Sequence, residues 1–240
     1  MNYENMTALS IIKSLKSLTL EDRNNALNSK EIINKFRNEL LIDCCRGDIY
    51  RNYRDIFDVI DVDYFFKVFD YPAIHNSFRI LDYKDFSNYK KYKENRDKIK
   101  LEEINKKIDD SRNRNANQYK LFVVLCEKDL NKTVGHILKD DNLFKEFFKK
   151  ADDMYSCFAS LDYDLIVNII MKLEHFDSYF NGSGYEFISC IGSDKQKRLL
   201  DENFSDEFIM KLLGYFHPSV VSYFFQKIKE HFIYIKKFLT

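Results

Sequence analysis

The sequence predicts an all-α protein, and three observations support that prediction. Glycine and proline, which most often interrupt helices, number only 6 and 2 in 240 residues. Apolar residues recur at the spacing of one helix face along most of the chain. Helix start signals precede many of these segments. Such helices pack either as an irregular bundle or as a short solenoid like HEAT and armadillo repeats, and both remain open because no strict period recurs.

The N-terminal part, residues 1–82, is expected to form a subdomain of three or four short helices. Thr19 is a start signal, and Asn28 with Glu31 resembles a capping box. A further helix is predicted over residues 55–70, and Pro72 marks a restart. The first helix is expected where apolar residues recur every third position, at Leu9, Ile12, Leu15 and Leu18.

The segment 83–117 is expected to be a long charged helix, followed by a polar loop at Ser111–Asn117, that links two subdomains. From Lys84 to Arg114 it holds eleven basic against seven acidic residues. Tyrosines are interleaved at its start, and aromatic rings beside cations can stack on RNA bases. The same pattern is also typical of a solvated helix that needs no partner.

The candidate residues for contact with RNA or a partner protein lie in this segment and near the C-terminus. They are Lys84, Tyr89, Lys90, Lys91, Tyr92, Lys93, Arg96, Lys98, Lys100, Lys106, Lys107, Arg112, Arg114, Lys236 and Lys237. The chain has no net charge, but an acidic stretch at residues 55–70 and basic groups after residue 195 indicate charge segregation. Basic faces can meet phosphate, and acidic faces can meet basic protein.

The C-terminal part, residues 118–240, is expected to form a repeat-like helical subdomain. Three apolar helix faces are predicted over residues 165–176, 208–216 and 221–239. Start signals are a capping box at Ser193–Gln196, Ser205 before two acidic residues, and Pro218 at a first helical position. The apolar run Leu121–Leu125 fits a helix or a buried strand.

Motifs for metal, cofactor or covalent chemistry are not expected. The five histidines and five cysteines lack the spacing of a metal site. Cys157 and Cys190 adjoin apolar residues, so they are expected to be small core residues. The glycine cluster at residues 181–184 suits a helix stop better than a phosphate site. An odd number of cysteines and the lack of a signal-peptide or membrane-span pattern predict a cytoplasmic protein.

The sequence therefore predicts a non-catalytic helical interaction protein without cofactor, metal or small-molecule substrate. The specific hypothesis is docking on a large protein–RNA assembly, best exemplified by the ribosome, as a regulatory or dormancy factor. One alternative is a viral or parasite protein that binds host proteins in the cytosol through an apolar groove. Another is an enzyme whose site is assembled from distant residues. Abundant Phe, Tyr, Ile, Lys and Asn without Trp fits an A/T-biased, compact genome.

Overall fold

The computed structural model describes residues 3–45, 47–81, 111–149, 151–180, 184–202 and 204–238. Throughout these ranges the regular elements are helices, with no β-strand, so the all-α prediction is confirmed. None of the described helices is long and apolar enough to cross a bilayer. The chain divides into two compact units, Met1–Leu143 (unit 1) and Phe144–Thr240 (unit 2).

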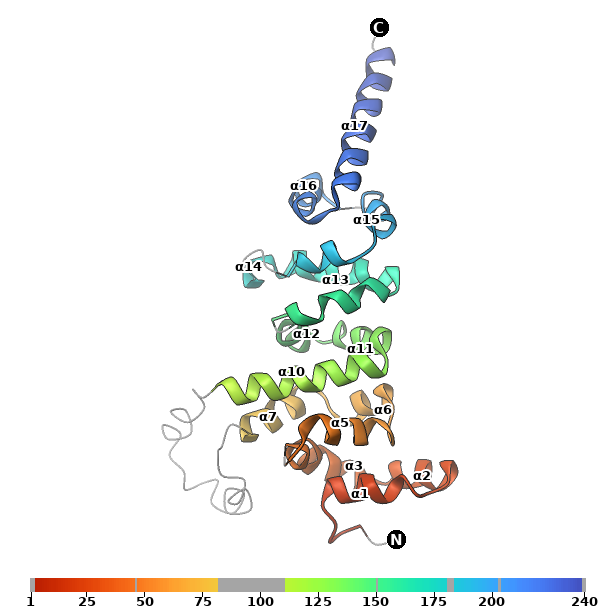
Figure 1. The fold of residues 1–240 in the computed structure, drawn as a ribbon, viewed down its shortest axis with the longest axis vertical. Coiled ribbons are helices and arrows are strands. Elements are labelled where there is room, and N and C mark those ends of the chain that lie inside the picture. Colours follow the sequence, from red (N-terminus) through yellow and green to blue (C-terminus); the bar gives the residue numbers. More distant parts are fainter. Residues whose placement is uncertain are drawn as a thin grey trace. The chain divides into compact units, whose positions relative to one another are not determined.

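Unit 1 is built from short helices packed around a core of aromatic and aliphatic side chains. Its elements are α1 (Ala8–Leu15), α2 (Leu20–Leu27), α3 (Lys30–Lys35), the π-helical η1 (Phe36–Leu40), α4 (Leu41–Cys44), α5 (Ile49–Phe57), α6 (Val62–Val68), α7 (Tyr71–Leu81), α10 (Ser111–Lys128), α11 (Leu130–Ile137) and the start of α12 (Asp141–Phe148). Helix α10 packs against α5 and α7 (Figure 1). Its apolar run Leu121–Leu125, open between helix and strand in the sequence, is helical and contributes to the core.

Three sequence predictions in unit 1 are wrong, and each error concerns where a helix begins. Residues 111–117 start α10 and do not form a loop. Residues 55–70 do not form one helix, because Asp61 accepts a hydrogen bond from the Tyr64 amide at 2.7 Å and starts α6. Asn28 closes α2, whereas Ser29 caps α3. The cap chemistry was present in the sequence, but aspartate and serine are too common to locate every start.

The predicted division into residues 1–82, 83–117 and 118–240 stays a prediction. Residues 82–110, the greater part of the expected linker, lie outside the described residues.

Unit 2 has a helix at each of the three predicted apolar faces, but the second helix ends at Leu212 and not at residue 216, and the side chains of residues 231–239 lie outside the described set. After α12 it comprises the 3₁₀ helix η3 (Asp152–Ser160), α13 (Tyr163–His175), α14 (Asp177–Phe180), the 3₁₀ helix η4 (Glu186–Cys190), α15 (Ser193–Leu199), α16 (Asp206–Leu212), the 3₁₀ turn η5 (Leu213–Tyr215) and α17 (Pro218–Phe238). Ser205 caps α16 and Pro218 opens α17, as predicted. The capping box at Ser193–Gln196 is wrong, because the N-cap of α15 is Gly192 and makes no side-chain cap.

One turn recurs three times in unit 2. Each 3₁₀ helix ends at an extended, buried residue: Leu161, Ile191 and Phe216. The amide of each donates to the carbonyl three residues earlier, at 3.1, 3.3 and 3.4 Å respectively. Two residues after each, an α-helix begins. The three copies are unequally spaced in the chain, which explains why no strict period is visible in the sequence.

A second motif, which we call the i−8 joint, links successive helices in both units. In each joint, the fourth residue after a helix N-cap donates a side-chain hydrogen bond to the carbonyl eight residues before it. The joints are Arg23 to Leu15 at 3.1 Å, Asn52 to Cys44 at 2.8 Å, Thr133 to Leu125 at 2.9 Å and Gln196 to Ile188 at 2.7 Å. The carbonyls of Leu15, Leu125 and Ile188 also accept a backbone amide, so in these joints the side chain is a second donor. Each joint links the end of one element to the first turn of the next helix and so helps to fix the direction of that helix.

Gln196 makes the most connected joint. Its Nε2 also donates to the Ile191 carbonyl at 3.1 Å, and its Oε1 accepts from the His217 amide at 2.7 Å. The side chain is 1% exposed. It therefore ties η4, α15 and the start of α17 together.

We predict that Gln196→Met lowers the free energy of unfolding by about 2 kcal/mol, because it removes the side-chain partner of the Ile191 carbonyl and of the His217 amide in a buried site. The Ile188 carbonyl keeps its bond from the Ile191 amide. The volume of the side chain is nearly unchanged, so lost packing contributes little. The control is Gln226→Met on α17, where the glutamine bonds only to exposed Glu230. Urea unfolding that gives equal losses for the two variants would contradict the joint.

Candidate functional site

Most of the candidate contact residues fall outside the described residues. These are Lys84, Tyr89, Lys90, Lys91, Tyr92, Lys93, Arg96, Lys98, Lys100, Lys106 and Lys107. The backbones of Arg112 and Arg114 lie in α10, and those of Lys236 and Lys237 lie in α17, but their side chains are likewise outside the described set. The predicted RNA-contact surface therefore stays a prediction.

The acidic stretch at residues 55–70 is largely engaged within unit 1. Lys16 Nζ lies 2.5 Å from an oxygen of Asp55 and 2.9 Å from one of Asp58. These hydrogen bonds raise the pKa of Lys16. Asp61 and Asp70 accept amide hydrogen bonds at the starts of α6 and α7. The sequence cluster thus reflects caps and ion pairs, which reduces the charge it can offer a basic partner.

The basic residues of α15 are similarly engaged within unit 2. Lys195 Nζ donates to the carbonyls of Ala159 and Leu161, at 2.8 and 2.6 Å. The guanidinium of Arg198 lies 3.6 Å from the ring centroid of Tyr163, a cation–π contact. These cations hold α15 against η3 and α13. The charge segregation seen in the sequence is, in these places, intramolecular pairing.

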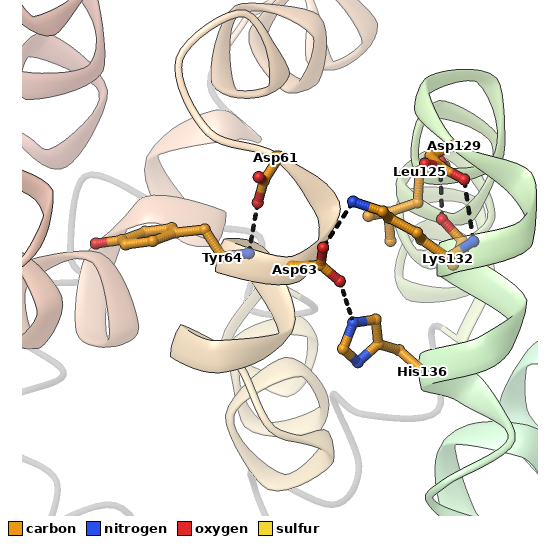
Figure 2. A network of polar contacts seen from close by, with 8 residues as sticks. Asp61, Asp63, Tyr64, Leu125, Asp129, Lys132 and His136 are labelled. Carbon is orange, nitrogen blue, oxygen red and sulfur yellow. Dashed lines mark hydrogen bonds and ion pairs between the residues drawn. The ribbon is translucent and has the colours of Figure 1, made fainter. Parts of the chain in front are cut away.

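A polar bridge between α6 and α11 is the clearest cluster of charged side chains in unit 1 (Figure 2). Asp63 lies 2.7 Å from Lys132 Nζ and 2.8 Å from His136 Nε2. The His136 ring stacks on Phe66, with centroids 4.7 Å apart. Hydrogen bonds from Lys132 and His136 lower the pKa of Asp63, and Asp63 raises the pKa of Lys132. Because the carboxylate is shared between two donors at a half-exposed site, the arrangement suits a bridge between helices.

A cleft of about 540 Å³ lies in unit 2 and is the candidate site for a small ligand. Its lining combines aromatic rings with two opposite charges: Phe148, Lys149, Tyr155, Tyr179, Phe180, Gly184 and Glu186. This volume lies within the range of small-molecule pockets. Among the described residues of the lining there is neither a histidine beside a cysteine nor a pair of carboxylates, the arrangements that would support the enzyme alternative.

Gly184 forms one edge of this cleft in a conformation that favours glycine. Its φ is +95°, and its amide donates to Glu186 Oε2 at 2.7 Å. A Cβ at this position would lie 3.1 Å from Leu173 Cδ2. The rest of the predicted glycine turn, residues 181–183, lies outside the described residues.

The prediction that Cys157 and Cys190 are core residues is wrong. Cys157 is exposed and Cys190 is partly exposed. Both lie on 3₁₀ helices, whose period of three residues places the neighbouring Phe158 and Ile188 inside and the cysteines outside. Within the described ranges, no group of three His, Cys, Asp or Glu residues could hold a metal ion.

Exposed large apolar side chains mark a different kind of candidate site. In the described part of the chain they are Leu20, Met171, Tyr179, Met210, Tyr223 and Phe225, and all but Leu20 belong to unit 2. Tyr223 and Phe225 share α17, which packs against α15. An apolar face left in solvent on a long helix is typical of a protein-binding surface. The sequence showed the apolar period of α17 but could not show which part of it stays uncovered.

We predict that the Asp63 bridge stabilises unit 1 at neutral pH and not in strong acid. The folded-state pKa of Asp63 lies below its ordinary value, so its contribution is present above about pH 4 and is lost as the pH falls through the folded-state pKa. Asp63→Asn should therefore unfold at lower urea than the unmodified chain at pH 7, and the two midpoints should converge near about pH 2. A difference that stays constant over this range would rule out the ion pair as its cause.

We also predict opposite effects for two glycine-to-alanine changes. Gly184→Ala should lower the free energy of unfolding by about 1–2 kcal/mol, because alanine is strained at positive φ and its Cβ crowds Leu173. Gly135→Ala, within α11 with nothing within 4 Å of the added Cβ, should raise it by about 0.5–1 kcal/mol. Chemical unfolding measures both, and a stabilising Gly184→Ala would contradict the described edge of the cleft.

Comparison with known proteins was made at the level of family, sequence and structure. No protein-family model, curated protein or solved structure matches this chain. Its function is therefore inferred from its own residues and geometry.

Proposed function

We propose that this chain is a non-catalytic interaction protein whose helix pairs stack as a short solenoid, in the manner of HEAT and armadillo repeats. The observation that carries the proposal is the recurrence of the same two connections, the 3₁₀ turn before a helix and the i−8 joint. Repeated connections of this kind place successive helix pairs in similar orientations, which creates extended surfaces suited to binding macromolecules.

Contacts within unit 2 support the stacked arrangement. The 3₁₀ helix η3 packs against η4, and η4 packs against η5. Phe158 and Phe187 meet there with ring centroids 5.8 Å apart, and Phe148 lies 6.2 Å from Phe187. Equivalent turns in direct contact are what a solenoid requires, so these contacts support the proposed stacking.

The partner class proposed from the sequence is a large protein–RNA assembly such as the ribosome, in the cytoplasm, bound in a regulatory role. The basic segment from Lys84 to Arg114 carries that part of the proposal. The alternative of a virus or parasite protein bound to host proteins is favoured by a different feature, the exposed apolar side chains of α17. In both cases the scaffold binds macromolecules, and the two differ in which surface does so.

We predict that the triple change Lys90→Glu, Lys91→Glu and Lys93→Glu abolishes salt-sensitive co-sedimentation with ribosomal particles, because it replaces local positive charge by negative charge. The measurement is gradient sedimentation of a lysate at low and high salt. The control reverses Lys13, Lys30 and Lys139, which are exposed lysines of unit 1, and makes the same change in total charge.

Two results would count against the proposal. Migration of the unmodified chain as a free monomer under all conditions would overturn the interaction function. Co-sedimentation that survives the triple change with the same salt dependence would remove residues 90–93 from the binding surface and leave a protein partner as the better account.

A further inference from the structure

The strongest unassigned feature is α17, the last helix of unit 2. It starts from the same turn as α13 and α15: a 3₁₀ helix, a buried extended residue, and a helix two residues later. Helix α13 is followed by α14, and α15 is followed by α16.

One side of α17 is anchored to unit 2. Val220 is fully buried, and Lys227 forms an ion pair with Asp201. The ammonium group of Lys197 on α15 lies 5.7 Å from the ring centroid of Tyr223. These contacts orient the helix, so the direction of its remaining surface is fixed.

The other side carries an apolar stripe in solvent. Val221, Phe225 and Ile228 follow one another at intervals of four and three residues, the spacing of a helix–helix seam. Phe225 is 53% exposed, and Val221 and Ile228 are only partly covered. The sequence repeats the same spacing at Phe232, Ile235 and Leu239. The side chains of these last three residues lie outside the described set.

The charged side chains beside the stripe determine which kind of partner helix could bind there. Exposed Lys229 lies one turn beyond Phe225, beside the stripe. Lys227 is paired with Asp201 on the anchored side, so among the described side chains of α17 Lys229 is the lysine beside the stripe. A second copy of the chain would bring its own Lys229 to this seam, and like charges beside a helix–helix seam disfavour pairing. A helix with aspartate or glutamate beside its apolar stripe would be attracted.

We propose that the stripe of Val221, Phe225 and Ile228 on α17 docks an amphipathic helix of a partner protein whose apolar face is flanked by acidic residues. This site rests on the proposed interaction function and names the chemistry of one partner. The binding mode is helix in groove, in which apolar anchors supply affinity and flanking charges supply selectivity.

The test uses the full chain and two synthetic helical peptides of about 20 residues, long enough to span α17. Both have leucine at the a and d heptad positions, and the flanking e and g positions are glutamate in one and lysine in the other. Fluorescence anisotropy should show that the glutamate peptide binds at least tenfold more tightly than the lysine peptide. Phe225→Ser and Lys229→Glu should each weaken that binding about tenfold, as loss of a central anchor or a charge reversal does.

The control variant is Met171→Ser, which removes an equally exposed apolar side chain from α13 and should leave binding unchanged. Circular dichroism of each variant checks that the helices persist. Failure of the glutamate peptide to bind, or equal affinity for both peptides, would overturn the proposal.

Two other occupants are outcomes of the same experiment and would also overturn it. Self-association in analytical ultracentrifugation that Phe225→Ser abolishes would identify a second copy on the stripe. Binding to vesicles of anionic phospholipid that needs Phe225, without peptide binding, would identify a membrane surface. If the chain still migrates with a large assembly when the peptide fails to bind, the site on α17 is wrong while the proposed interaction function survives.

Discussion

The architecture depends on one interaction, the hydrogen bond from a side chain early in one helix to a carbonyl near the end of the element before it. Short helices leave a large share of their carbonyls without intrahelical donors, and burying such groups unpaired costs more than a typical hydrogen bond contributes. Asn52, Thr133 and Gln196 supply donors from buried positions, and those of Thr133 and Gln196 add to a backbone amide on the same carbonyl. Each bond also fixes the angle at which the next helix begins, so satisfaction of the backbone and orientation of the helices come from the same contact.

The contacts of the remaining polar side chains depend on where these hydrogen bonds place the helices. Once the helices are placed, aspartates at their starts cap exposed amides, and lysines reach across to neighbouring carboxylates or carbonyls. Asp61 and Asp63 differ by two positions but act differently, since Asp61 caps its own helix and Asp63 bridges to α11 (Figure 2). Much of the charge that looks segregated in the sequence is therefore used within each unit. The apolar stripe on α17 is different in kind, because the described contacts of that helix lie on its other side.

The helical class, the apolar faces of α13 and α16 and the starts at Ser205 and Pro218 could be predicted from the sequence, because periodicity and caps are local signals. The role of Gln196 could not, since its partners Ile191 and His217 come together only when the turn has folded. The exposure of Cys157 was missed for a similar reason: its apolar neighbours suggested burial, but the 3₁₀ period turns it outward. The apolar stripe on α17 could be recognised only from the sequence and the structure together. Its spacing is visible in the sequence, and the packing of the helix shows which side is covered.

The most direct test of the account is amide hydrogen exchange at His217 in the unmodified chain. This amide donates to Gln196 Oε1 at 2.7 Å and has its bond only if the joint is formed. The account predicts exchange far slower than in an unstructured peptide, and a return to fast exchange in Gln196→Met. The amides of Phe65 and Phe69, which donate to the Asp61 and Phe65 carbonyls at the two ends of α6, should stay protected in that variant. Fast exchange at His217 in the unmodified chain, at a pH where the helices are formed, would contradict the joint and with it the repeat on which the proposed function rests.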